Sequence, residues 1–144
     1  MYLEGIGNRS ALPALEKTLA FNEARLRMIA ENVANVHTPG YRARQLEPAG
    51  FQSALRAALE EKGTDPSRRL VVDDGKQVAT RPDGTLRVTP TLEPVEAVLF
   101  HDGTNLSMER QMADLAETGM MHELTTTLMR GYFDGLRKAI RGTA

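Results

Sequence analysis

Apolar residues near the N-terminus recur at alternating steps of three and four, over about residues 12–36. This spacing is typical of an amphipathic α-helix that presents a heptad seam to another helix. One polar residue, Asn22, interrupts the seam. The helix is expected to end before Thr38-Pro39-Gly40, because the residue before a proline avoids the helical region and Pro-Gly favours a turn. The apolar residues of this predicted packing seam are Leu12, Leu15, Leu19, Leu26, Ile29 and Val33.

A second amphipathic pattern runs from about residue 108 to residue 140. Its steps again alternate between four and three, but its middle holds Gly119, His122 and Thr126 in place of apolar residues. A parallel apolar stripe widens the face, so this helix is expected to contact more than one neighbour. Its glycines either permit close backbone approach or mark a helix that becomes ordered only when packed. The apolar residues of this second seam are Met108, Met112, Leu115, Met129, Phe133, Leu136 and Ile140.

The segment between the two seams has a different pattern. A shorter helix is predicted over residues 48–62, with Gly63 ending it. Short β-type runs follow at residues 70–72, 77–80 and 85–88, and Asp-Asp-Gly and Pro-Asp-Gly turn signals separate them. The pattern predicts one or two small hairpins.

Together these patterns predict a mainly α fold. Long N- and C-terminal helices are expected to form a coiled-coil-like pair, with a short helix and a small β-hairpin or loop insert between them. Residues 1–41 and 101–144 would form the helical core, and residues 42–100 would form a variable insert that contains the short helix.

The composition fits one domain of ordinary size with an aliphatic core. The chain has 144 residues, of which 41% are hydrophobic and 5% aromatic, and it has no Trp. Its formal net charge of -1 provides no overall field that would attract nucleic acid or an anionic membrane. No apolar stretch approaches the length of a membrane span. The N-terminus has neither the basic start nor the apolar core of a cleaved signal peptide.

Residue types that carry catalysis are absent or scattered. The lack of Cys excludes disulfides, Cys-ligated zinc and thiol catalysis. None of the three histidines, His37, His101 and His122, has a carboxylate or a second His at metal-ligand spacing. No glycine-rich phosphate loop, nucleophile elbow or zinc-protease helix occurs. We therefore expect no catalytic site, no cofactor and no metal, and a function other than enzymatic.

The most distinctive segment is Ala30–Tyr41, which reads AENVANVHTPGY. Asn32 and Asn35 lie near the end of the predicted helix, where their side chains are suited to bond backbone carbonyls or a neighbouring chain. A simple helix stop would explain Pro39 and Gly40 but not the paired asparagines.

This segment resembles a motif of the flagellar basal-body rod family, whose members carry an N-terminal helix that ends in Asn-x-x-Asn-x-x-Thr-Pro-Gly-Tyr. Residues 102–117, which read DGTNLSMERQMADLAE, resemble the start of the C-terminal helix in the same family. The chain length and the following Arg42-Ala43-Arg44 are most similar to the proximal rod proteins. The resemblance covers about residues 12–62 and 101–141. The residues that match the motif, and that form the predicted assembly motif, are Asn32, Asn35, Thr38, Pro39, Gly40 and Tyr41.

The resemblance implies a structural component of the bacterial flagellar basal-body rod, at its proximal end. Proteins of this family polymerise through their terminal helices and transmit torque between the membrane ring and the hook. The implied partners are other copies of the chain, other rod proteins, and membrane-ring and export-gate proteins, with no nucleic acid and no direct membrane insertion. The implied location is the periplasm-spanning rod, reached from the cytoplasm by flagellar export without a cleaved signal peptide.

Three other functions are alternatives to a proximal rod protein. The first is another axial rod protein of the same family, the second is a cytoplasmic helical adaptor or export chaperone, and the third is a small enzyme that uses residues 64–100. The adaptor explains the seams and the lack of catalytic residues, but it does not explain the Thr-Pro-Gly-Tyr turn. No constellation of residues supports the enzyme.

Overall fold

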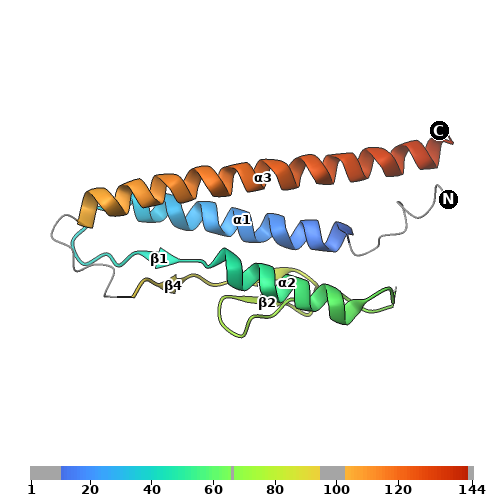
Figure 1. The fold of residues 1–144 in the computed structure, drawn as a ribbon, viewed down its shortest axis with the longest axis horizontal. Helices are drawn as coiled ribbons and strands as arrows, with labels where there is room; N and C mark the ends of the chain where they lie inside the picture. The colour runs from blue at the N-terminus through green and yellow to red at the C-terminus, as the bar shows by residue number, and fades with distance from the viewer. Residues whose placement is uncertain (1–10, 66, 95–102, 143–144) are drawn as a thin grey trace.

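The computed structural model describes residues 11–65, 67–94 and 103–142. These residues include helices α1 (Ala11–Ala34), α2 (Pro48–Lys62) and α3 (Gly103–Arg141). Figure 1 shows α1 and α3 side by side and antiparallel, with α2 and the strands on the other side of α1. The predicted fold class, long terminal helices with a short helix and small strands between them, is confirmed.

The long helices differ slightly from the ranges that the apolar pattern predicts. α1 ends at Ala34, because the chain turns through hydrogen bonds from Val36 N to Val33 O and from Thr38 N to Asn35 O. α3 begins at Gly103, before the first seam residue near 108, because the first turn of a helix needs no apolar side chain.

α2 occupies the range predicted from the sequence. Pro48 lies in its first turn, where the missing N–H of proline breaks no helical hydrogen bond. Gly63 ends the helix with a φ of +55°, and its N–H donates to Leu59 O at 3.0 Å. The backbone of any residue other than glycine would be strained at that φ.

Within the part of the chain that the structure describes, four short strands form two separate antiparallel pairs. β2 (Val78–Thr80) pairs with β3 (Leu86–Val88), which is the hairpin predicted around the Pro-Asp-Gly turn. β1 (Arg44–Gln45) pairs with β4 (Thr91–Leu92), which brings the two ends of the insert together. The sequence did not indicate this second pairing, because the partner strands are short and far apart along the chain.

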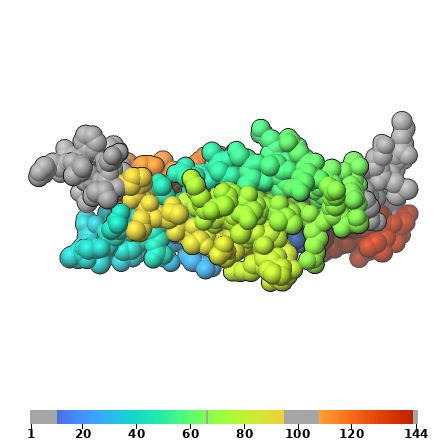
Figure 2. Space-filling view, turned by 90° about the horizontal axis from the view of Figure 1, so that it is seen from below, coloured from blue at the N-terminus to red at the C-terminus, as the bar shows by residue number. Residues whose placement is uncertain are grey.

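The hydrophobic core lies between α1 and the insert. The rings of Phe21 on α1 and Phe51 on α2 are stacked, with centroids 4.4 Å apart and planes 5° apart. Ile29 and Val72 are almost completely buried. In Figure 2 the insert covers most of α1 on the side away from α3. The buried apolar residues of this core are Phe21, Met28, Ile29, Leu46, Phe51, Ala58, Leu70, Val72, Val78 and Leu86.

Residues of α1 therefore share one core with the described part of the insert. The division of the chain into a helical core, residues 1–41 and 101–144, and an insert, residues 42–100, stays a prediction. Within the described ranges, no helix is both long and apolar enough to cross a membrane.

Candidate assembly interface

The side chain of Asn32 joins the end of α1 to three other parts of the fold. Only 4% of this residue is exposed. Its Nδ2 donates to Arg44 O at 2.8 Å and to Gln111 Oε1, on α3, at 3.2 Å. Its Oδ1 accepts from the Tyr41 hydroxyl at 2.9 Å and from Arg44 N at 3.0 Å. Since the amide is fully bonded, Asn32 holds α1, the turn, β1 and α3 in one arrangement.

Asn35 stabilises the turn locally. Its Nδ2 donates to Glu31 O at 2.9 Å, and its Oδ1 accepts from Thr38 Oγ1 at 3.2 Å. The N–H of Tyr41 donates to Thr38 O at 3.2 Å, and Gly40 between them has a φ of +78°. The left-handed φ favours glycine at this position. The paired asparagines therefore have different roles, since Asn32 links elements and Asn35 shapes the turn.

Tyr41 is placed as a hydrogen-bond donor to Asn32. Burial raises the pKa of its hydroxyl above the usual 10.0, the negative charge of Glu31 adds to this, and Arg44 opposes it. The hydroxyl therefore stays protonated at neutral pH and keeps its bond to Asn32. Pro39, the remaining part of the turn, is exposed.

A buried arginine links the middle of α1 to α3. Arg25 Nη1 donates to Thr118 Oγ1 at 2.7 Å, and Nη2 lies 3.3 Å from Asp114 Oδ1. Nη1 also lies 3.4 Å from Glu117 Oε2. The side chain of Arg25 is only 9% exposed, while those of Asp114 and Glu117 are 31% and 65% exposed. No pattern in the sequence points to Arg25, because a single arginine next to an apolar seam is usually a surface residue.

The inner face of α3 is polar at its most buried positions. Gln111, Thr118 and Thr125 are buried and repeat every seven residues. Thr118 and Thr125 donate to their own helix, at Asp114 O and Met121 O. The predicted seam placed Met112, Gly119 and Thr126 at the contact, each one residue further along, and one residue corresponds to a rotation of about 100° around the helix axis. The seven-residue spacing of these polar residues is visible in the sequence, but apolar periodicity does not detect it.

Several buried polar atoms at this contact have no hydrogen-bond partner among the described residues. They are Asn22 Nδ2, Arg25 Nε and His122 Nδ1. An unsatisfied buried polar group costs about 1–3 kcal/mol. The α1–α3 contact is therefore less favourable than an all-apolar seam, although its polar pairs define which residues face each other.

The apolar seam residues predicted from the sequence differ in exposure. Ile29 is 1% exposed and belongs to the core. Three members of the α3 seam are exposed, namely Met112 at 42%, Phe133 at 41% and Ile140 at 85%. Their role in packing against neighbouring chains stays a prediction. The other members are half-buried: Leu12, Leu15, Leu19, Leu26, Val33, Met108, Leu115, Met129 and Leu136.

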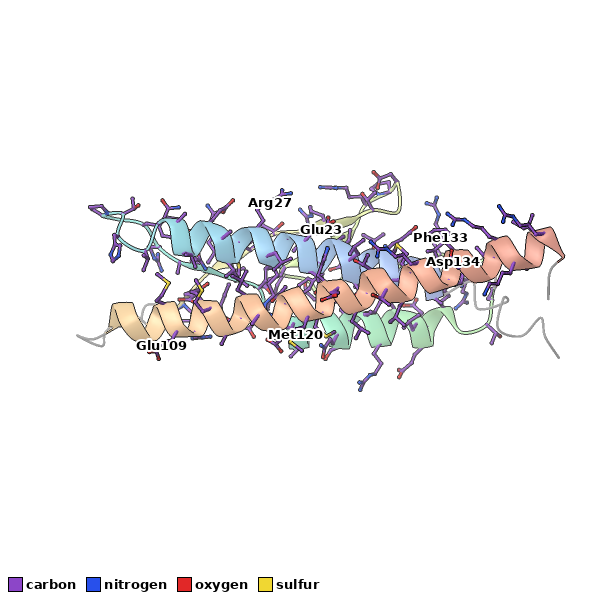
Figure 3. All side chains as sticks on the ribbon, turned by 90° about the horizontal axis from the view of Figure 1, so that it is seen from above. Glu23, Arg27, Glu109, Met120, Phe133 and Asp134 are labelled. Carbon is purple, nitrogen blue, oxygen red and sulfur yellow. The ribbon has the colours of Figure 1, made fainter. Side chains whose placement is uncertain are left out.

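Large apolar side chains are exposed along much of α3. Figure 3 shows Met120 and Phe133 on this helix, with Glu109 near its N-terminal end. Met120 is 73% exposed. Four of the exposed apolar residues lie within about 100° of one another around the helix axis, because each residue adds a rotation of about 100°. A patch of this kind marks an interaction surface in many proteins. We call this surface the α3 apolar face, and its residues are Met120, Met121, Leu124 and Leu128. Met112, Phe133 and Ile140 are also exposed but project in other directions.

The described residues contain no cluster of three or more His, Cys, Asp or Glu that could hold a metal ion. The described residues instead form an antiparallel helix pair, a turn held by Asn32, and an apolar face of α3 that is exposed to solvent.

A helix pair ended by this Asn-x-x-Asn-x-x-Thr-Pro-Gly-Tyr turn is the arrangement implied by the resemblance to flagellar basal-body rod proteins. Curated proteins from several bacteria that match the chain carry the name flagellar basal body rod protein FlgB. The Borrelia hermsii protein is 28% identical over 120 residues, which is 81% of this chain and 85% of that protein. The resemblance to the rod family, and within it to FlgB, is therefore confirmed.

Two further relatives cover even more of the chain. The Aeromonas hydrophila protein is 24% identical over 126 residues, 86% of this chain and 87% of its own length. The Escherichia coli K12 protein is 22% identical over 138 residues, 92% of this chain and 94% of its own length. The similarity thus spans the insert as well as both terminal helices. No family model matches the chain, and no solved structure shows a significant match.

Proposed function

We propose that this chain is a structural subunit of the bacterial flagellar basal-body rod, in the proximal position of FlgB. The observation that carries the proposal is the similarity to FlgB proteins over most of the chain, including the turn at Asn32–Tyr41. The chain acts by assembly and not by catalysis. It transmits torque between the membrane ring and the hook.

The α3 apolar face is the surface that joins neighbouring copies or other rod proteins. Its exposed side chains bury apolar area when another helix covers them, at about 25 cal/mol for each Å² removed from water. A contact between different surfaces of identical subunits, if it does not close into a ring, builds an open helical filament. The predicted seam residues Met112, Phe133 and Ile140 are exposed on other sides of α3, where they would contact further neighbouring chains.

The assembly motif supports this function by fixing the end of the helix pair. Asn32 bonds α1, β1 and α3 together, and Asn35 with Gly40 shapes the turn. A rigid end allows the pair to present the same surface in every subunit. We propose that this turn also contacts neighbouring chains in the rod. The chain reaches the rod through the flagellar export apparatus, and its partners include other rod proteins and components of the membrane ring and export gate.

The test uses a tagged chromosomal copy and a clean deletion. The tagged protein is expected in isolated basal bodies, and the deletion is expected to abolish swimming and to leave basal bodies without a rod. Replacement of Asn32, Asn35 and Tyr41 together by Ala is expected to reduce both rod assembly and motility.

The outcome separates this function from that of a cytoplasmic adaptor or export chaperone. A protein found only in the cytoplasm and never in purified basal bodies would contradict a rod subunit. A deletion that blocks export of other rod proteins, while the tagged chain itself stays in the cytoplasm, would support the chaperone instead.

A further inference from the structure

A cleft of about 920 Å³ opens between the start of α1, the end of α2 and the tip of the β2–β3 hairpin. It lies away from the α3 apolar face, on the part of the molecule that the insert builds. Segments 67–71 and 80–86, which belong to the insert, lie on the face seen in Figure 2. The proposed function does not use this cleft.

Positive side chains outnumber carboxylates among the residues that line the cleft. The carboxylates are those of Glu16 and Asp83. Asp83 is already engaged, since its Oδ1 accepts from Thr85 N at 2.8 Å and from Thr85 Oγ1 at 2.7 Å. The positive side chains are Lys17, Lys62, Arg68, Arg69 and Arg81.

Two of the cations are buried and bonded only to neutral oxygens within the described part of the chain. Lys17 is 4% exposed, and its Nζ donates to Gly84 O at 2.9 Å and to Thr80 Oγ1 at 3.3 Å. Lys62 is 7% exposed, and its Nζ donates to Asp65 O at 3.3 Å. Their positions are therefore fixed before any ligand arrives, which lowers the entropy lost on binding.

Two arginines at the rim of the cleft are likewise bonded to neutral oxygens. Arg69 Nη1 donates to Pro82 O at 3.0 Å, and Arg81 Nη1 lies 3.4 Å from Thr85 Oγ1. Neither forms an ion pair with a described residue. A guanidinium has five N–H donors, so most donors of both side chains remain available to an incoming carboxylate.

The cleft also has apolar walls. Pro13 and Ala20 of α1 line one side, Leu70 and Leu86 line the other, and Val71 is 56% exposed beside them. A single phosphate would fill only a small part of this volume and would leave the apolar walls in water. The combination of spread cations and apolar walls fits a peptide that carries both carboxylates and apolar side chains.

We propose that this cleft binds an acidic, partly apolar peptide segment of a partner protein. The carboxylates of the segment pair with Arg69 and Arg81 at the rim and compensate the buried charges of Lys17 and Lys62. Its apolar side chains cover Leu70 and Val71. The α3 apolar face and this cleft would then serve two different partners.

The experiment measures binding of a fluorescent peptide with repeated Glu-Glu-Leu to the full chain by anisotropy. A matched peptide with Gln in place of Glu is the ligand control. The Arg69→Gln/Arg81→Gln variant is expected to lower affinity by about tenfold or more. The Arg56→Gln/Arg87→Gln variant removes the same charge from exposed positions outside the cleft, and it is expected to bind within about twofold of the wild type.

Mapping on the wild-type chain provides a second measurement that does not depend on the variants folding. Amide NMR shifts on adding the Glu-Glu-Leu peptide are expected around residues 13–20, 68–71 and 81–86. Equal binding of the Gln peptide, equal losses in the two variants, or shifts confined to α3 would overturn the proposal. Competition by inorganic phosphate at the concentration of the peptide would show a small-anion site instead. A wild-type dimer that the Arg69→Gln/Arg81→Gln variant loses would show a second copy as the occupant, and would also overturn it.

Discussion

Arg25 Nη1 on α1 donates a 2.7 Å hydrogen bond to Thr118 Oγ1 on α3, and both residues are buried. The same guanidinium lies against the carboxylates of Asp114 and Glu117. A buried charge that is held by specific partners favours one alignment of two helices over its neighbours, because any shift would leave the charge unpaired. The α1–α3 pair is therefore aligned by polar contacts at its centre.

Replacing Arg25 by Ala is expected to lower the free energy of unfolding by about 2–3 kcal/mol, because it removes a buried side chain and its bonds to α3. Urea denaturation followed by circular dichroism measures the change. Arg27→Ala is the matched control, since Arg27 is exposed on the same helix and should change the value by less than about 0.5 kcal/mol. Equal losses in the two variants would show that the contacts of Arg25 contribute nothing measurable.

The two asparagines of the turn are expected to differ in their effect on stability. Asn32→Ala removes a buried amide with four hydrogen bonds and leaves Gln111 without this partner, so it should cost about 2–4 kcal/mol. Asn35→Ala removes two exposed bonds near the same turn and should cost about 0.5–1 kcal/mol. Thermal and urea unfolding of the two proteins provide the comparison. A larger loss for Asn35→Ala would contradict the linking role of Asn32.

Asp74 is expected to make stability depend on acid pH. Its partial burial raises the pKa of the carboxyl, but hydrogen bonds from the backbone N–H groups of Val78, Lys76 and Gln77 have the opposite effect. Together these bonds outweigh the burial, so the pKa lies below its usual value of 3.8. A carboxyl with a pKa lower in the folded than in the unfolded state stabilises the fold above the unfolded pKa. This contribution is lost as the pH falls through the folded pKa.

The Asp74→Asn variant tests this sign. Its deficit in free energy of unfolding should be largest above about pH 5 and should shrink as the pH falls below about 4. Urea denaturation at a series of pH values gives the difference from the wild type. Asp134→Asn, at an exposed carboxylate on α3, is the control and should change stability little at pH 7. A deficit that grows in acid would contradict the interpretation.

Charged substitutions on the α3 apolar face should affect assembly without affecting the monomer. Met120 is 73% and Leu124 is 51% exposed, so Met120→Glu/Leu124→Glu should change the free energy of unfolding by less than about 1 kcal/mol. Recovery of the protein in basal bodies and swimming should both be lost. The control Leu92→Glu changes an apolar residue that is 50% exposed on β4 and should leave both intact. Normal swimming with both helix substitutions would exclude this face from the rod contacts.

Local patterns in the sequence predicted the helices and the hairpin well. Pro48 and Gly63 mark the ends of α2, and the Pro-Asp-Gly turn marks the hairpin of β2 and β3, because these residues act through their own backbone conformations. The β1–β4 pairing, in contrast, could not be predicted from local patterns. It depends on contacts between distant segments, and neither strand is long enough to show an alternating pattern.

The assembly motif was also visible in the sequence, although its internal chemistry was not. The spacing of Asn32, Asn35 and Gly40 indicated a specialised turn. Only the fold shows that Asn32 bonds to Gln111, since a hydrogen bond between residues in two distant helices leaves no local pattern. Arg25 was missed for the same reason.

The sequence by itself determined that both ends of the chain form long amphipathic helices, because apolar periodicity depends only on residues a few positions apart. The tertiary structure decided how each face is used. α1 has two partners, and it turns Phe21 towards Phe51 of the insert and Arg25 towards α3. As a result, the most buried positions of α3 are Gln111, Thr118 and Thr125, while much of its apolar surface remains outside. The orientation of each helix about its own axis makes this difference, and only contacts between distant segments select that orientation.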